Sequence, residues 1–335
     1  MRTLSALQML IVALFAITAM APESAAQKDL PYVAVHDPQF ISAGDVTFLN
    51  GDDRVIGVVD GEVAKAYPAG ILWQHALVED NSARGPIAIT WCAYCNTAIV
   101  FKAEAKGKPL TLDISDTAGG NEVFKDQETG SRWQQAGLDA ISGPLQGEHL
   151  QLYPSLLTSW AEWRRLHPNT LVLKPLPGYA ERIAAVNKFV KQGGFGATPV
   201  PEGVTYRDER LKPKAMVLGI DLGGTDKAYP LDALRLALVI NDSLGGTPLA
   251  IVHQPPTDTT TAFVAKVGAR RLTFASSNAD GTELIDHETK SRWNAYGECV
   301  SGRLKGSKLE PIVFQPGYWF AWSEFHRDTA IYAPL

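Results

Sequence analysis

The sequence predicts a mainly β fold with short helices, built as a tandem duplication of one barrel-like or sandwich-like β module. Short runs of β-branched and aromatic residues, bounded by Gly, Asp or Asn, are typical of strands. A segment that starts at Val55 recurs at Val217, which is 217 − 55 = 162 residues later. The 335 residues are 45% hydrophobic and 20% charged, an ordinary globular composition with room for about two domains.

Residues 1–26 have the pattern of a secretory signal peptide. Arg2 gives a short basic start, residues 9–21 are apolar, and Ser24-Ala25-Ala26 supplies small residues for cleavage. The apolar run is shorter than the about 20 residues that a membrane span needs. We therefore expect a periplasmic or secreted protein with no membrane insertion after cleavage. The formal net charge of −5, without a block of Lys and Arg, predicts no nucleic-acid partner.

The duplication divides the rest of the chain. Residues 55–101 align without a gap with residues 217–263, and 14 of these 47 positions are identical, among them Lys-Ala-Tyr-Pro in both copies. Glu-Thr-x-Ser-Arg-Trp then occurs at 128–133 and again at 288–293. We expect a first β module that carries the site at 27–176, a connector at 177–212, and a second, degenerate β module at 213–335.

Each module reads as a series of strands with few helices. In the first module the strands are expected at PIAITWC, TAIVFKA, LTLDIS and NEVFKD, and in the second at PLAIVH, AFVAKV and RLTFAS. One helix is expected after each Tyr-Pro, and one in SLLTSWAEWRRLHP, where apolar residues recur at helical spacing before a proline. The connector holds a possible short helix, ERIAAVNKFVKQ, which ends before a Gly-rich stretch.

The duplication also serves as an internal control on the cysteines. Cys92 aligns with Gln254, Cys95 with Thr257, and His75 with Ala237, while the apolar pattern around them persists. The second module therefore does not need these three side chains in order to fold. Their joint presence in the first module indicates a site.

Metal ligation is the leading interpretation of that site. Two thiolates and an imidazole are ligands that Cu(I) and Zn accept, and we favour Cu(I) over Zn as the cofactor. Asn96 is a candidate for orienting a ligand from outside the coordination sphere. A small disulfide and a redox-active pair remain open as alternatives. Haem attachment is excluded, because Asn96 stands where the Cys-x-x-Cys-His motif requires His.

These segments together resemble the bacterial DUF3179 proteins. The resemblance rests on AYPAGILWQHALVED, ITWCAYCNTAIVF, ETGSRWQQ, AISGPLQG and TSWAEWRRLHPNTLVL, with DERLKPK and YWFAWSEFHRDTAIY further on. The chain departs from the family's pattern at Gln74, which separates Trp73 from His75, and at Ala93, where Pro is usual. The resemblance implies an exported protein with a site at the cysteine pair. It implies no reaction, because the family's function is undefined.

We therefore expect an exported metal-binding protein, in metal handling or redox, with a metal ion as partner and with His75, Cys92 and Cys95 as ligands. The alternatives are a thiol-dependent or metal-dependent periplasmic enzyme, an oxidoreductase or a hydrolase, and a disulfide-stabilised binding or structural protein. The sequence does not decide whether the protein is an enzyme.

Overall fold

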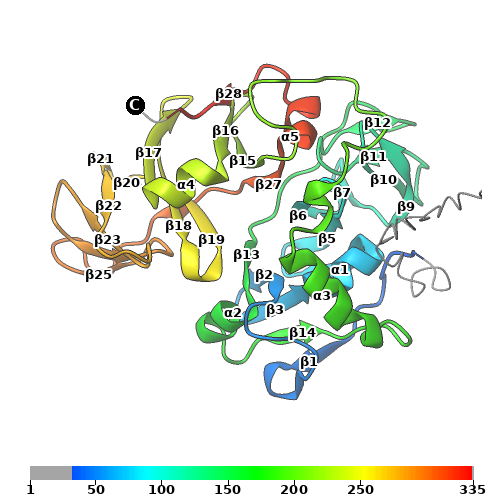
Figure 1. Cartoon of the computed structure of the whole chain (residues 1–335), viewed down its shortest axis with the longest axis horizontal. Coiled ribbons are helices and arrows are strands. Elements are labelled where there is room, and N and C mark those ends of the chain that lie inside the picture. The colour runs from blue at the N-terminus through cyan, green and yellow to red at the C-terminus, as the bar shows by residue number, and fades with distance from the viewer. Residues whose placement is uncertain (1–31, 334–335) are drawn as a thin grey trace, which may run out of the picture. The chain divides into compact units, whose positions relative to one another are not determined.

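The computed structural model describes residues 32–333, which belong to one compact unit, so the expected signal peptide lies outside the described residues. The fold is mainly β, with the strands gathered in several small sheets (Figure 1). The strand order of every sheet within 32–333 is open at both ends, and no closed barrel is formed. Within the same residues no helix is long and apolar enough to cross a membrane.

The N-terminal half, residues 32–176, contains a five-stranded, a four-stranded, a three-stranded and a two-stranded sheet. Their strand orders are β1-β14-β3-β2-β13, β12-β11-β10-β9, β4-β5-β6 and β7-β8. The strands are β1 (Phe40–Ser42), β2 (Arg54–Asp60), β3 (Val63–Pro68), β4 (Leu77–Ser82), β5 (Gly85–Cys92), β6 (Thr97–Lys102), β7 (Glu104–Ala105), β8 (Lys108–Pro109), β9 (Leu112–Ala118), β10 (Asn121–Asp126), β11 (Arg132–Gln134), β12 (Ala140–Ser142), β13 (Leu156–Ser159) and β14 (Leu171–Leu173).

The C-terminal half, residues 213–333, contains three four-stranded sheets and a two-stranded one. Their strand orders are β27-β15-β16-β28, β17-β18-β19-β26, β22-β23-β24-β25 and β20-β21. The strands are β15 (Met216–Asp221), β16 (Asp226–Pro230), β17 (Val239–Leu244), β18 (Thr247–Gln254), β19 (Thr259–Val264), β20 (Lys266–Val267), β21 (Arg270–Arg271), β22 (Phe274–Ser276), β23 (Glu283–Asp286), β24 (Arg292–Asn294), β25 (Cys299–Ser301), β26 (Glu310–Pro311), β27 (Gln315–Tyr318) and β28 (Ala330–Ile331).

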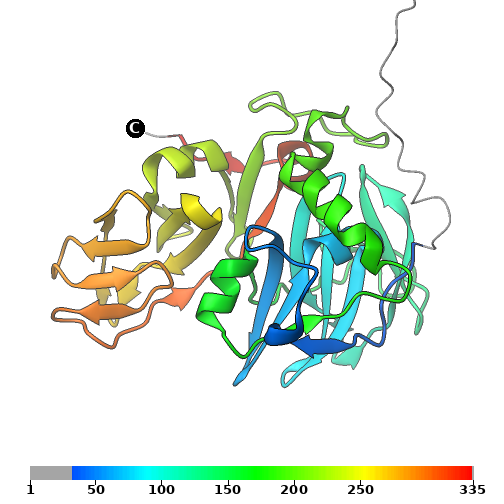
Figure 2. The ribbon, with the colours of Figure 1, turned by 60° about the horizontal axis from the view of Figure 1, so that its bottom comes forward.

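The α-helices are short, and those expected after each Tyr-Pro, in SLLTSWAEWRRLHP and in the connector are all present. They are α1 (Ala69–His75), α2 (Trp160–Leu166), α3 (Ile183–Lys191), α4 (Leu231–Ala237) and α5 (Trp319–Phe325). Helix α3 of the connector lies beside α1 in both views (Figures 1 and 2). The 3₁₀ turns are η1 (Ala43–Asp45), η2 (Ala180–Arg182), η3 (Gly194–Ala197) and η4 (Pro255–Thr257).

Helix α2 begins later than the periodicity of SLLTSWAEWRRLHP predicts. Leu156–Ser159 is strand β13, which pairs antiparallel with β2. The side chain of Ser159 then caps the helix, because it accepts a hydrogen bond from Glu162 N at 3.3 Å. Sheet pairing therefore takes the apolar residues that helical spacing alone assigns to the helix.

A buried tryptophan is packed on a glycine in each half. The Trp163 side chain of α2 covers Gly57 of β2 and donates from Nε1 to Thr170 Oγ1 at 2.9 Å. Trp322 of α5 covers Gly219 of β15 in the same way, and its Nε1 donates to Thr329 Oγ1 at 3.0 Å. Both tryptophans are buried and belong to the core.

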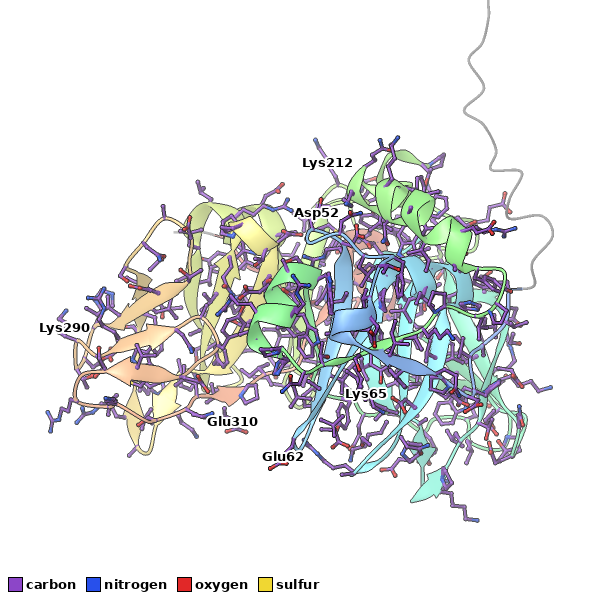
Figure 3. All side chains as sticks on the ribbon, turned by 90° about the horizontal axis from the view of Figure 1, so that it is seen from below. Asp52, Glu62, Lys65, Lys212, Lys290 and Glu310 are labelled. Atoms are coloured by element: carbon purple, nitrogen blue, oxygen red, sulfur yellow. The ribbon has the colours of Figure 1, made fainter. Side chains whose placement is uncertain are left out.

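A second matched contact joins the β2–β3 hairpin to β4. Glu62 lies at the tip of this hairpin, and Lys65 lies further along β3 (Figure 3). Lys65 Nζ and Tyr67 Oη both reach Asp80 Oδ2, at 2.6 and 2.5 Å. In the C-terminal half, the Asp242 carboxylate receives a lysine and a tyrosine in the same arrangement, Lys227 at 2.7 Å and Tyr229 at 2.9 Å.

The glycine under Trp163 gives a stability prediction. A Cβ at position 57 would lie 2.2 Å from the Trp163 ring, and one at position 219 would lie 2.0 Å from the Trp322 ring. We expect Gly57→Ala and Gly219→Ala each to lower the free energy of unfolding by about 1–3 kcal/mol, as overpacked cores do. The control is Gly44→Ala, where a Cβ meets no atom of the described residues within 4 Å. Urea unfolding measures all three, and equal stability of Gly57→Ala and Gly44→Ala would contradict the packing argument.

Candidate functional site

The two cysteines lie on the turn between β5 and β6. Cys92 is the last residue of β5 and pairs with Thr97, so residues 93–96 close a tight hairpin. Asn96 adopts a φ of 50°, a left-handed conformation that Asn tolerates better than most residues. This turn brings Cys92 Sγ to 2.7 Å from Cys95 Sγ. Both cysteines are free thiols, and their exposed fractions are 1% and 0%.

The Cys95 sulfur is held by the start of strand β10. Its thiol lies 3.1 Å from Gly120 O, and Asn121 Nδ2 donates to the sulfur at 3.2 Å. Asn121 is itself fixed, because its Oδ1 accepts from Ala136 N and Gln134 Nε2, both at 2.8 Å. The sulfur therefore lies in a polar contact network with little freedom to move.

Burial sets the protonation state of this thiol. Burial raises the pKa of Cys95 well above its usual value, the thiol contact with Cys92 raises it further, and the Asn121 hydrogen bond opposes both effects. Burial also raises the pKa of the nearby Glu122 carboxyl, which accepts from Tyr32 Oη at 3.1 Å. At neutral pH Cys95 is therefore a thiol and not a thiolate, which makes it a slow nucleophile in the closed structure.

His75 ends helix α1 and makes contacts of its own. Its Nδ1 lies 3.0 Å from Val33 O, and its ring lies 4.4 Å from the Tyr179 ring. Its Nε2 is buried and has no hydrogen-bond partner within residues 32–333. In the same residues no group of three or more His, Cys, Asp or Glu side chains is placed to hold a metal ion. The structure thus places the thiols of Cys92 and Cys95 in contact. The three-ligand site with His75 stays a prediction.

Asn96 joins three parts of the molecule. Its Oδ1 accepts from Trp91 Nε1 at 3.2 Å, and its Nδ2 lies 3.3 Å from the Met216 sulfur in the C-terminal half. From the sequence we expect Asn96 to orient a ligand, and that role stays a prediction. In the structure it orients Trp91 and meets Met216, which packs against the apolar cluster that contains both cysteines.

The C-terminal half closes the site, and sequence reasoning missed this contribution. Tyr318 N donates to Cys95 O at 2.8 Å, and Lys214 Nζ donates to Tyr94 O at 3.2 Å. Lys214 also lies over the rings of Tyr318 and Phe320, at 4.8 and 5.0 Å. These residues are more than a hundred positions from the cysteines, and no local pattern in the chain connects them.

The position aligned with the cysteine turn holds a similar turn without sulfur. Pro255–Thr257 forms η4, and Asp258 adopts a φ of 47°, close to that of Asn96. Arg54 of the N-terminal half donates from Nη1 to Thr257 O and Asp258 O, both at 2.9 Å. Each turn therefore receives a basic side chain from the opposite half. The remaining cysteine, Cys299, is a buried free thiol.

The fold and site define a mainly β protein with a buried dithiol where its two halves meet. Residues 28–329 match the family described as "Protein of unknown function (DUF3179)", so the chain belongs to the DUF3179 family. The resemblance seen in the sequence is thereby confirmed. Neither the curated proteins nor the solved structures contain a significant match to the chain.

The raised pKa of Cys95 gives a prediction about alkylation. In the reduced native protein at pH 7 we expect iodoacetamide to modify Cys95 at least roughly tenfold more slowly than in urea, because the thiol is buried and protonated. The rate should rise as the pH rises toward the elevated pKa. Peptide mass spectrometry measures both rates, and equal rates at pH 7 in native and unfolded protein would contradict the burial argument.

Proposed function

We propose that this is an exported protein whose working group is the Cys92–Cys95 pair, which alternates between two thiols and one disulfide. The observation that carries the proposal is the 2.7 Å separation of the two sulfurs. A disulfide bond is about 2.0 Å long, so the turn needs only a small adjustment to close it. Of the alternatives that the sequence leaves open, a thiol-dependent oxidoreductase fits this geometry best.

Oxidation of the Cys92–Cys95 pair transfers two electrons and two protons. Oxidation breaks the two S–H bonds, forms the Cys92–Cys95 bond, releases two protons and passes two electrons to the disulfide of an exchange partner. The partner's disulfide is thereby reduced to two thiols, through a mixed disulfide. Because the cysteines are at most 1% exposed, this exchange requires the turn to open. Tyr94, which lies between the two cysteines in the chain, is 49% exposed. An exchange partner would therefore approach the turn from the side of Tyr94.

Burial suits a pair with these two states. A dithiol and a disulfide are both uncharged, so neither incurs the desolvation cost that a buried thiolate would. The Asn121 amide can donate to the Cys95 sulfur in either state. Gly120 O accepts from the Cys95 thiol in the reduced state, and oxidation removes that donor. The surroundings therefore favour the reduced pair, and the turn adjusts locally when the disulfide forms.

Copper binding remains the second proposal for the same pair. Cu(I) prefers soft sulfur ligands, and a third soft ligand, the Met216 thioether, packs against the cluster that holds both thiols. Zinc is less favoured, because its structural sites take four Cys, His or carboxylate ligands. A role of His75 beside the cysteines belongs to this second proposal.

The tandem duplication belongs to the proposal as well. Four consecutive elements recur with their bounds shifted by 162 residues: α1 and α4, β4 and β17, β5 and β18, and β6 and β19. The Gly57–Trp163 and Gly219–Trp322 contacts support it too. In this proposal, the first copy retains the cysteine pair, and the second copy provides the surface that packs against the cysteine turn. The periplasmic or secreted location is likewise proposed, on the pattern of residues 1–26.

The redox proposal is tested by incubating the protein with oxidised glutathione and mapping disulfides by mass spectrometry. We expect an internal Cys92–Cys95 bond in the wild type and in Cys299→Ser, and none in Cys92→Ser or Cys95→Ser. Cysteines that stay reduced at every glutathione ratio would contradict it.

Copper binding is tested separately, by Cu(I) transfer from a chromogenic chelator to the reduced protein. The wild type is compared with Cys92→Ser, Cys95→Ser and Cys299→Ser. Stoichiometric transfer that both Cys92→Ser and Cys95→Ser abolish, in a protein whose pair resists oxidation, would favour copper handling over redox exchange.

A further inference from the structure

A cavity of 430 Å³ lies beside the cysteine turn, between the two halves. Its volume is within the range of small-molecule sites, about 300–1,000 Å³. Apolar side chains from both halves line it: Trp91, Leu157, Met216, Leu218, Leu231 and Phe314. This lining suits an apolar body rather than a sugar or a nucleotide.

The charged groups of the lining are not equally engaged. Lys191 Nζ lies 2.8 Å from both Asp52 and Asp53, so two carboxylates already engage its one positive charge. Asp52 is a lining residue from the N-terminal half and is labelled in Figure 3. Asp258 and Arg54 are the other two charged residues of the lining.

Two hydrogen-bond donors of the Arg54 side chain, Nε and Nη2, have no partner among the described residues. Its side chain is 16% exposed, and its Nη1 donates to the carbonyls of Thr257 and Asp258. Within residues 32–333 no acceptor meets its Nε or Nη2, and neither atom is among the buried unpaired ones. These two donors are therefore accessible, in the forked geometry that matches a carboxylate.

At the Arg54 end of the cavity, two guanidinium groups face one carboxylate. The Asp258 carboxylate is shared by two guanidinium groups, Arg235 at 3.1 Å and Arg54 at 3.8 Å. Arg235 also meets Asp232, but at 3.6 Å and with an almost fully exposed carboxylate. Since exposed pairs contribute little, Asp232 offsets little of the positive charge at Arg54.

We propose that this cavity binds a small organic monocarboxylate with an apolar body, whose carboxylate pairs with Nε and Nη2 of Arg54. The apolar body lies against Trp91, Leu218 and Leu231. Asn96 belongs to both the lining and the cysteine turn, so the ligand contacts the residue that follows Cys95. The proposal does not depend on whether the cysteine pair serves redox exchange or copper.

The test uses phenylacetate as the probe and phenylacetamide as its neutral match, with binding measured by calorimetry and by ligand-observed NMR on the full mature chain. We expect phenylacetate to bind at least roughly tenfold more tightly than the amide, since a charged pair is worth more than a neutral hydrogen bond. Arg54→Met should remove this preference, because it weakens phenylacetate binding far more than phenylacetamide binding. Arg292→Met is the control, because Arg292 is exposed and lies outside the lining.

A second variant guards against misfolding of Arg54→Met. Leu157→Trp places bulk in the cavity and keeps Arg54, so it should abolish binding of both probes while the melting temperature stays close to that of the wild type. Equal affinity for acid and amide, undiminished binding by Arg54→Met, or no binding by the wild type would overturn the proposal. Inorganic phosphate that competes as well as phenylacetate would also overturn it, because the apolar walls would then contribute nothing.

Discussion

The backbone hydrogen bond from Tyr318 N to Cys95 O is the contact on which the site depends. The carbonyl of Cys95 lies in a hairpin turn, outside the ladder of β5 and β6, and a buried carbonyl needs a partner. Strand β27 of the C-terminal half supplies that partner, and its Tyr318 packs in the apolar cluster that contains both cysteines. Gly120 and Asn121 of the N-terminal half contact the Cys95 sulfur as well. The burial that raises the pKa of Cys95 therefore involves a segment more than two hundred residues away.

The cysteine turn has a counterpart in the C-terminal half that contains no cysteine. The η4 turn of the C-terminal half has a left-handed residue at its end, Asp258, as the cysteine turn has Asn96. Short polar side chains tolerate this conformation, which accounts for Asn and Asp at these two positions. Arg54 satisfies two carbonyls of the η4 turn from the opposite half. Both halves thus contain such a turn, and only the turn of the N-terminal half carries the pair Cys92 and Cys95.

Local patterns predicted the strands well and the helix at residues 155–168 only in part. The alternation and β-branched content of residues 86–92 and 97–103 depend on neighbours in the chain, so β5 and β6 were within reach of sequence reasoning. Strand β13 was not, because Leu156–Ser159 is strand only through its pairing with the distant β2. The site follows the same rule. The spacing of Cys92 and Cys95 predicted their contact, whereas Asn121, Met216 and Tyr318 reach the pair through tertiary folding. The expected barrel closure, too, depends on long-range pairing, and the sheets remain open.

The C-terminal half has no cysteine pair, but it contributes residues to the cysteine turn and to the cavity beside it. It supplies Tyr318 and Lys214 to the cysteine turn, and Met216, Leu218 and Leu231 to the cavity next to it. Met216 belongs to both places, and so does Asn96, whose amide touches it. Asn96 and Met216 therefore connect the cysteine turn to the cavity wall. The apolar cluster around the cysteines and the cavity beside it are both built from residues of the two halves, so each depends on the contact between the halves.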